Sequence, residues 1–420
     1  MTRSPDDHGR DPALFRGMTQ PRLSRRELFR YAGVGAGALS LGAVLAACGT
    51  GGGTPTPSAT GDTGLGSADW WSKQTQGDTV NFANWPYYID VQKGSHPTLD
   101  AFTKKTGMKV NYYEVVQDNT EFFQKIRPSL QAGQATGYDI VVMTQNVPVF
   151  SQFLKAGWAI PLNHDMMPNF DKYASDLVSD PSWDPGNKYS MAWQSGYTGM
   201  AYNTDYIKED ITSLQALFDP KYKGKVGMMS DPLDLGSAGL LSLGIDPEGS
   251  TPDEWQKAAD KLQEQKDAGI VRSYYNQSYI SALKNEDTWL GLAFSGDVFQ
   301  ANLSGFTNIK FLIPDEGAMF WTDNMMIPLY ADNPLGAMTL MDYIYDPHVQ
   351  ALIEDYNHYV CPVPAAQDII ANELKDPDVA NSPLVFPTPD MTAVSKSYYS
   401  FKDNQEVQAW NDTFLPLVQG

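Results

Sequence analysis

The chain has 420 residues, of which 42% are apolar and 19% are charged, a composition typical of a globular protein with room for two domains. Its formal net charge of −20 argues against a nucleic-acid partner, because phosphate backbones are bound through Lys and Arg. The same acidic balance is compatible with a cationic partner.

The N-terminal segment has the features of an export signal. The adjacent arginines Arg25 and Arg26 precede an uncharged Ala- and Gly-rich run over residues 31–47, which ends in LAAC at Cys48. A charged start, an apolar middle and small residues before a cleavage point are typical of a secretory signal. The paired arginines resemble a Tat export signal, and LAAC resembles a bacterial lipobox in which Cys48 becomes the lipid-modified first residue. The alternative is a transmembrane helix, but 17 residues fall short of the usual ~20.

Cleavage before Cys48 has consequences for the mature chain. Residues 1–47 carry seven basic and four acidic side chains, so their removal takes the net charge from −20 to −23. Cys361 is then the only cysteine besides the lipidated one, which leaves no intramolecular disulfide, and we expect a buried thiol there. Residues 48–77 are rich in Gly, Ser, Thr and Pro and form the expected flexible tether. We expect an extracytoplasmic protein, anchored by lipid to the outer face of the bacterial cell membrane.

From residue 78 onward, strand and helix patterns alternate. Expected strands cover residues 79–85, 110–115, 138–144, 225–231, 289–297, 309–317 and 319–328. Expected helices cover residues 96–107, 119–133, 147–157, 233–244, 251–269, 333–347 and 347–357. This alternation predicts an α/β fold, and its two blocks predict two lobes with a ligand in the crevice at the carboxyl ends of strands.

The sequence offers little support for catalysis. The histidines show no metal-ligand spacing, and no nucleophile elbow, phosphate-binding loop or dinucleotide fingerprint occurs. We therefore expect no enzyme activity, cofactor or metal. One enzymatic alternative stays open, a surface carbohydrate-active enzyme that uses paired carboxylates.

Acids and aromatic residues recur together where expected strands end. The residues are Trp85 and Tyr88, then Asp231 and Asp234, then Phe294 and Asp297, then Trp321 and Asp323, and finally Tyr359. Singly, each has a structural explanation, since an Asp caps helices and aromatic rings fill cores. Together they suit an organic ammonium ion, because cations bind aromatic faces and carboxylates accept hydrogen bonds from the N–H groups.

The body also resembles the periplasmic spermidine- and putrescine-binding proteins of polyamine ABC importers, from about Val80 to Leu415. The motifs that carry the resemblance, in chain order, are NFANWPYYID, FTKKTGMKV, YDIVVMT, KYSMAWQSGYTGMAYN, LFDPKYKGKVGMMSD, LAFSGDVFQA, PDEGAMFWTDNMMIP and YVCPVPAA. The resemblance implies a two-lobed type II periplasmic-binding fold with hinge crossovers and an interlobe cleft. It divides the body into residues 78–196 plus 322–368 for lobe 1 and residues 197–321 plus 369–420 for lobe 2.

The resemblance also implies the roles of individual residues. Asp323 would bind an ammonium group while Trp321 and Trp85 stack on the ligand chain. The other implied contacts are Tyr88, Thr144, Asp231, Asp234, Phe294, Asp297 and Tyr359. Asp297 matches an acid of the putrescine-binding branch.

The sequence also departs from the family pattern. Pro86 and Tyr87 replace a hydroxyl residue and an acid, Asn146 replaces a Tyr, and Phe294 replaces a Trp. These departures leave the length of the polyamine open between putrescine and spermidine.

The expected function is that of a monomeric substrate-binding lipoprotein that delivers a polyamine to an ABC permease. A second interpretation keeps the fold but changes the ligand to another small cationic organic solute, because a fold does not determine its ligand.

Overall fold

The structure is a computed structural model that describes residues 64–419, apart from residues 87, 276 and 277. The strands are β1 (Thr79–Asn84), β2 (Lys109–Glu114), β3 (Ile140–Thr144), β4 (Ser190–Asn203), β5 (Val226–Met229), β6 (Val271–Tyr275), β7 (Leu290–Phe294), β8 (Ile309–Leu312), β9 (Ala318–Met326) and β10 (Ser395–Lys396). No helix within these described residues is both long enough and apolar enough to cross a membrane.

The helices alternate with these strands for most of the chain. They are α3 (Ala68–Ser72), α4 (Pro97–Thr106), α5 (Asn119–Gln131), α6 (Pro148–Lys155), α7 (Pro168–Tyr173), α8 (Pro232–Ser242), α9 (Pro252–Asp267), α10 (Tyr279–Lys284), α11 (Ser295–Leu303), α12 (Pro334–Ile344), α13 (Pro347–Asn357), α14 (Ala366–Ile369), α15 (Pro377–Ala380), α16 (Pro389–Ala393) and α17 (Asn404–Val418). The elements expected from the sequence are present, with ends that shift by a few residues. Elements that were not expected include β4, β6, α10, α11 and α17. The expected strand over residues 289–297 ends at Phe294, so Asp297 lies in the first turn of α11 instead of on a strand.

One ten-stranded sheet organises the chain, with the order β2-β1-β3-β9-β4-β7-β5-β6 and with β8 and β10 paired to β4 and β9. The strands β2, β1 and β3 are parallel to one another, and so are β7, β5 and β6. Between these two groups, the long strands β4 and β9 pair antiparallel. The fold is therefore two parallel α/β units joined through a central antiparallel pair, which confirms the α/β prediction.

Each parallel group has its own hydrophobic core. Around β1–β3, one cluster includes Phe82 and Trp193, and another, beneath α5 and α6, includes Phe150. Around β5 and β7, a separate cluster includes Trp255 and Trp410. We call the part that packs around β1–β3 the first lobe and the part around β5–β7 the second lobe.

The strand β3 shows how sequence pattern and burial are connected. Ile140 and Val142 pack in one cluster of the first lobe, while Val141 and Met143 pack in the other. Because successive side chains of a strand point to opposite faces, both faces of β3 are covered by helices. An unbroken apolar sequence such as that of residues 140–143 is typical of a parallel strand buried on both faces.

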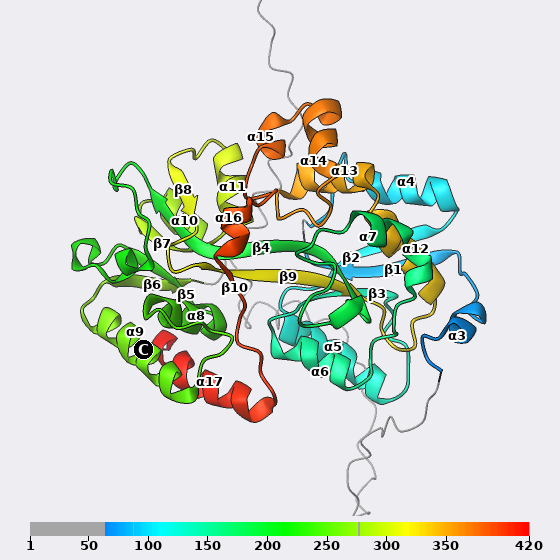
Figure 1. The fold of residues 1–420 in the computed structure, drawn as a ribbon, viewed down its shortest axis with the longest axis horizontal. Coiled ribbons are helices and arrows are strands. Elements are labelled where there is room, and N and C mark those ends of the chain that lie inside the picture. Colours follow the sequence, from blue (N-terminus) through cyan, green and yellow to red (C-terminus); the bar gives the residue numbers. More distant parts are fainter. Residues whose placement is uncertain (1–63, 87, 276–277, 420) are drawn as a thin grey trace, which may run out of the picture. The chain divides into compact units, whose positions relative to one another are not determined.

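Three segments pass between the lobes. The strand β4 leaves the first-lobe core at Trp193 and enters the second-lobe core at Met200, and β9 returns from Met319 to Met325. The third segment covers residues 386–397 and contains β10, which pairs with β9. Figure 1 shows β4 and β9 running side by side between the two groups of helices. Any movement of one lobe against the other must bend these segments.

A buried acid, Glu354, lies within the first-lobe core. Its exposed fraction is 0%, and its Oε1 accepts a hydrogen bond of 2.8 Å from the Gln350 side chain one helical turn earlier. Burial raises the pKa of Glu354 to about 8, against the lowering effect of its hydrogen bonds. Glu354 is therefore protonated in the folded protein at pH 7 but ionised in the unfolded chain.

This difference predicts an unusual pH dependence of stability. Between the ordinary pKa of 4.5 and about 8, unfolding releases the Glu354 proton, so raising the pH over this range favours unfolding. Glu354→Gln removes the titration, and each pKa unit is worth about 1.4 kcal/mol. We expect thermal melts of the variant to lose less stability than the wild type between pH 5 and pH 8. The exposed Glu264→Gln should keep the wild-type slope. Equal slopes for wild type and Glu354→Gln would contradict this account.

Candidate functional site

Asp323 lies on β9 where the two lobes meet, and its exposed fraction is 5%. Its strand neighbours are Gln194 on β4 and Thr144 at the carboxyl end of β3. The Thr144 hydroxyl donates to Asp323 Oδ1 at 2.6 Å, and the Tyr88 hydroxyl donates to Oδ2 at 2.9 Å. Asn119 fixes Thr144 in turn, since its Nδ2 donates to Thr144 Oγ1 at 3.0 Å.

The charge of Asp323 is costly in this environment. Burial raises its pKa to about 6, although the hydrogen bonds from Thr144 and Tyr88 lower it. Within the described part of the chain, no ion pair includes Asp323. A cation placed beside Asp323 would favour the ionised form and would restore the balance of charge.

A second carboxylate, Asp297, stands in the first turn of α11 in the second lobe. Its Oδ2 accepts a hydrogen bond from the Tyr279 hydroxyl, and its Oδ1 accepts one of 3.4 Å from the Tyr359 hydroxyl. Burial raises the pKa of Asp297, while the bonds from Tyr279 and Tyr359 and the charge of Lys284 lower it. The same Tyr279 oxygen accepts the backbone N–H of Phe294 at 3.2 Å, which fixes it at the end of β7.

Five aromatic rings connect the two carboxylates, and we call them the aromatic wall. Consecutive centroids are 5.3 Å apart for Tyr88 and Tyr359, 5.7 Å for Tyr359 and Trp321, 6.0 Å for Trp321 and Phe294, and 5.8 Å for Phe294 and Tyr279. All four contacts are edge-on, with interplanar angles between 63° and 83°. Burial, then the charges of Asp297 and Asp323, raise the pKa of Tyr359 well above its usual value. Tyr359 is therefore close to both carboxylates.

Two glycines make room for the rings of this wall. Gly196 on β4 pairs with Trp321, and a Cβ at position 196 would lie 2.5 Å from Cζ2 of that indole. A Cβ at Gly296 would lie 2.6 Å from Cε1 of Tyr359. Any larger residue would have to displace a ring, so the close approach of backbone and ring requires glycine at both positions.

Asp231 and Asp234 form a separate acidic group at the start of α8. The side chain of Asp231 is the N-cap, and it accepts the backbone N–H groups of Leu233 and Asp234 at 2.8 and 3.2 Å. Asp234 is buried, and its Oδ1 accepts a hydrogen bond of 2.6 Å from the Tyr398 hydroxyl. Burial, then the charge of Asp231, raise the pKa of Asp234 to about 7.

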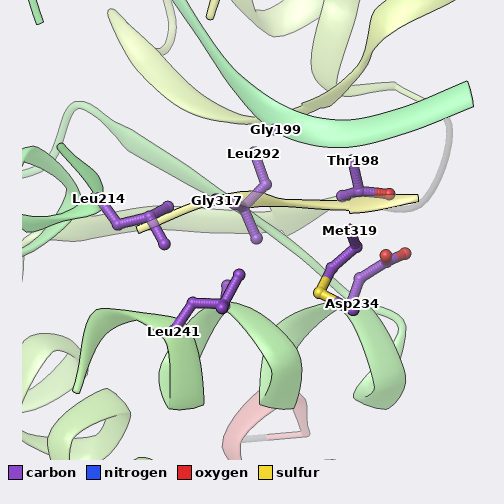
Figure 2. A pocket seen from close by; sticks show the side chains of 9 residues that line it. Thr198, Gly199, Leu214, Asp234, Leu241, Leu292, Gly317 and Met319 are labelled. Atoms are coloured by element: carbon purple, nitrogen blue, oxygen red, sulfur yellow. The ribbon is translucent and has the colours of Figure 1, made fainter. Parts of the chain in front are cut away.

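Tyr398 connects Asp234 to the crossover segments. Its hydroxyl lies 2.8 Å from Thr198 Oγ1 on β4, while Tyr398 itself follows the third crossover. Figure 2 shows Asp234 beside Met319 and below Thr198, at a cavity of about 10 Å³ whose other lining is mostly apolar. That volume holds at most about one water molecule. The carboxylate of Asp234 is thus engaged within the protein.

The structure brings together most, but not all, of the residues expected from the sequence. Those gathered around the wall are Tyr88, Thr144, Phe294, Asp297, Trp321, Asp323 and Tyr359. Trp85 is partly buried and packs against both first-lobe clusters, without a ring contact to the wall among the described residues. Cys361 is a buried thiol, as expected. Arg25, Arg26 and Cys48 lie outside the described residues.

Three residues that position these carboxylates were not anticipated. Tyr279 and Tyr398 each donate to an acid from a segment for which the sequence predicted no element. Asn119, at the start of an expected helix, acts through Thr144. Their sequences, SYIS and SYYS for the tyrosines, carry no motif that would have identified them. Only the fold shows their partners.

Comparison with known proteins agrees with this architecture. The family model of the bacterial extracellular solute-binding proteins matches residues 98–387. The putrescine-binding periplasmic protein SpuD of Pseudomonas aeruginosa is 28% identical over 355 residues, which cover 80% of this chain and 90% of that protein. The putrescine-binding periplasmic protein PotF of Escherichia coli is 29% identical over 334 residues, or 75% and 85% of the two chains.

A solved structure extends the likeness to the fold. The putative spermidine/putrescine ABC transporter from Listeria monocytogenes superposes with a TM-score of 0.67 at 27% identity, covering 81% of this chain and 99% of that one. The fold is accordingly the two-lobed fold of periplasmic binding proteins. The chain belongs to the bacterial extracellular solute-binding proteins.

Proposed function

We propose that this chain binds a polyamine, putrescine or spermidine, between its lobes and delivers it to an ABC permease without catalysing a reaction. The observation that carries the proposal is the pair of shielded carboxylates, Asp323 and Asp297, joined by the aromatic wall. The names of the relatives SpuD and PotF, which describe putrescine-binding periplasmic proteins, support the same ligand class.

The chemistry of the site suits an organic diammonium ion. Each carboxylate supplies charge-assisted acceptors for one ammonium group. The rings between them cover methylene groups, and each cation–ring contact contributes ~0.5–2 kcal/mol, depending on desolvation. An inorganic cation would be attracted to the two carboxylates but would make no apolar contact with the rings.

The arrangement favours a diamine over a triamine. Asp323 and Asp297 both contact the aromatic wall, so two ammonium groups can be accommodated along it. The third acidic group has no ring contact with the wall among the described residues, since Asp234 is bound to Tyr398 and Asp231 caps α8. Putrescine, with two ammonium groups for the two carboxylates at the wall, is therefore the preferred ligand in our proposal.

Binding would be coupled to movement of the lobes. Asp323 and Tyr88 are buried in the present arrangement, so a solute reaches them only after the lobes separate. A ligand that contacts Asp323 and Asp297 together favours the closed form.

The sequence-based lobe boundaries, at residues 196, 321 and 368, stay a prediction. For the last of these boundaries we propose a later position. Ile370 and Val385 pack in the first-lobe core, so the third crossover would begin near residue 386.

The direct test is titration calorimetry with putrescine, spermidine and spermine. We expect heat with putrescine and a loss of about 2–4 kcal/mol in Asp323→Asn, because the ammonium group loses its charged acceptor. The exposed Asp267→Asn on α9 is the control for the same change of charge, and it should bind as the wild type does. Absence of heat with every amine at millimolar concentration would contradict the polyamine proposal. Heat with another organic cation alone would keep the site and change the ligand.

We further propose that Arg25 and Arg26 direct export and that lipid on Cys48 anchors the mature chain. The observations that support this are the paired arginines, the apolar run and the LAAC sequence.

Metabolic labelling with palmitate tests the anchor. We expect the wild-type chain and Cys361→Ser to incorporate label in a bacterial host and Cys48→Ser to incorporate none, because Cys48 supplies the only modified thiol. Label that persists in Cys48→Ser, or an unlabelled wild type, would contradict the proposed anchor.

A further inference from the structure

A contact between the lobes lies one helical turn beyond the candidate site. Gln300 belongs to α11, which packs in the second-lobe core through Val298 and Ala301. Its Nε2 donates to the backbone carbonyls of Tyr356 and Asn357, at 3.3 Å each, and also contacts His358 Nδ1. These three partners form the carboxyl end of α13 and the residue after it, which belong to the first lobe.

The neighbouring residue strengthens the same contact. Phe299 packs against the first-lobe cluster, although its helix belongs to the second lobe, and its ring centroid is 5.2 Å from that of His358. The Gln300 amide bonds two carbonyl oxygens, and the Phe299 ring lies beside it against His358. Together these contacts fix how the two helices meet. A second contact between the lobes joins the exposed side chains of Gln152 and Asn404 at 2.7 Å. Exposed hydrogen bonds of that kind contribute less to stability, because water competes for both groups.

Gln300 is connected to the candidate site in two ways, through its own helix and through its partners at the end of α13. Asp297 and Gln300 are three residues apart on α11 and therefore lie on the same face of the helix. On the other side, Tyr359 directly follows His358 and donates to Asp297 at 3.4 Å. Asn357 Nδ2 donates to the carbonyl of Tyr88 at 2.8 Å, and Tyr88 in turn donates to Asp323. The end of α13 therefore positions a hydroxyl partner for each carboxylate.

We infer that Gln300 is a positioning residue, which holds the end of α13 against α11 and so stabilises the closed form before any ligand binds. The inference rests on the proposed binding function for its biological meaning, but the contact itself involves no ligand. Gln300 sets how much of the free protein is closed and aligns Tyr359 with Asp297. The fraction of closed protein scales the apparent affinity for the ligand.

Hydrogen–deuterium exchange of the ligand-free, full-length chain tests the contact. In Gln300→Ala we expect exchange over residues 355–361 to rise about tenfold, since the lost bonds contribute about 1.4 kcal/mol together. Gln300→Glu should exchange faster still, because a carboxylate cannot donate and would face two carbonyl oxygens. Exchange in β1 and β2 should not change in either variant, which separates a local opening from a general loss of stability.

The control and the ligand measurement complete the test. Gln256→Ala removes a surface glutamine that donates to Asp260 on its own helix, so it should exchange as the wild type does. Putrescine should dissociate from Gln300→Ala several times faster than from the wild type. If residues 355–361 exchange equally in wild type and both Gln300 variants, the inference is wrong. If no amine binds the wild type but the exchange differences are present, the contact stands and the proposed ligand fails.

Discussion

The constraint on which the rest of the structure depends is the free-energy cost of removing carboxylates from water. Asp323 has an exposed fraction of 5%, and its only described hydrogen-bond partners are the neutral hydroxyl groups of Thr144 and Tyr88. Asp297 also accepts hydrogen bonds from two hydroxyl groups, those of Tyr279 and Tyr359, but it is only partly buried, and the charge of Lys284 lowers its pKa. Hydroxyl donors orient a carboxylate but do not neutralise it, so burial raises the pKa of both acids. A cationic ligand would remove this cost, which is why charge balance indicates an ammonium ion more strongly than any single contact does.

The rest of the fold places these acids where lobe movement controls access. Asp323 and Trp321 lie on the crossover strand β9, and Gly196 on β4 leaves the space that Trp321 occupies. Asp297 comes from the second lobe, and Tyr88 and Tyr359 come from the first lobe. Each lobe therefore holds part of the wall, and the wall is complete only when the lobes meet. Selectivity for the ligand and closure of the lobes have the same structural basis.

The features that the sequence predicted correctly are those that local patterns determine. Thr251 and Glu254 have the Thr–x–x–Glu spacing that predicts a capping box at the start of a helix, and α9 begins with one, in which Thr251 N donates to Glu254 at 2.8 Å. The spacing of Trp321 and Asp323 on an expected strand predicted a ring and an acid close together, and both lie at the wall. The possibility that Asp231 serves as a helix cap, considered as a structural explanation, is what the structure shows.

Long-range partners were beyond the reach of sequence patterns. Tyr88 and Asp323 are 235 positions apart, and Tyr398 and Asp234 are 164 apart. No local propensity encodes such pairs, because they are brought together by β4, β9 and the third crossover. The sequence could not identify Gln300 for a similar reason, since two of its partners are backbone carbonyls, which any sequence provides. The resemblance to a known family supplied the candidate residues of the wall, and the structure supplied their geometry.

The central claim is that the ligand's ammonium groups meet Asp323 and Asp297. It is tested most directly by counting the protons exchanged when putrescine binds. Calorimetry at pH 6 in buffers of different ionisation enthalpy measures this number. A cation beside Asp323 lowers a pKa that burial has raised to about 6, while the amines stay protonated. The account predicts a net release of protons at pH 6 that becomes smaller in Asp323→Asn. Binding with no proton exchange, or with the same release in that variant, would contradict it.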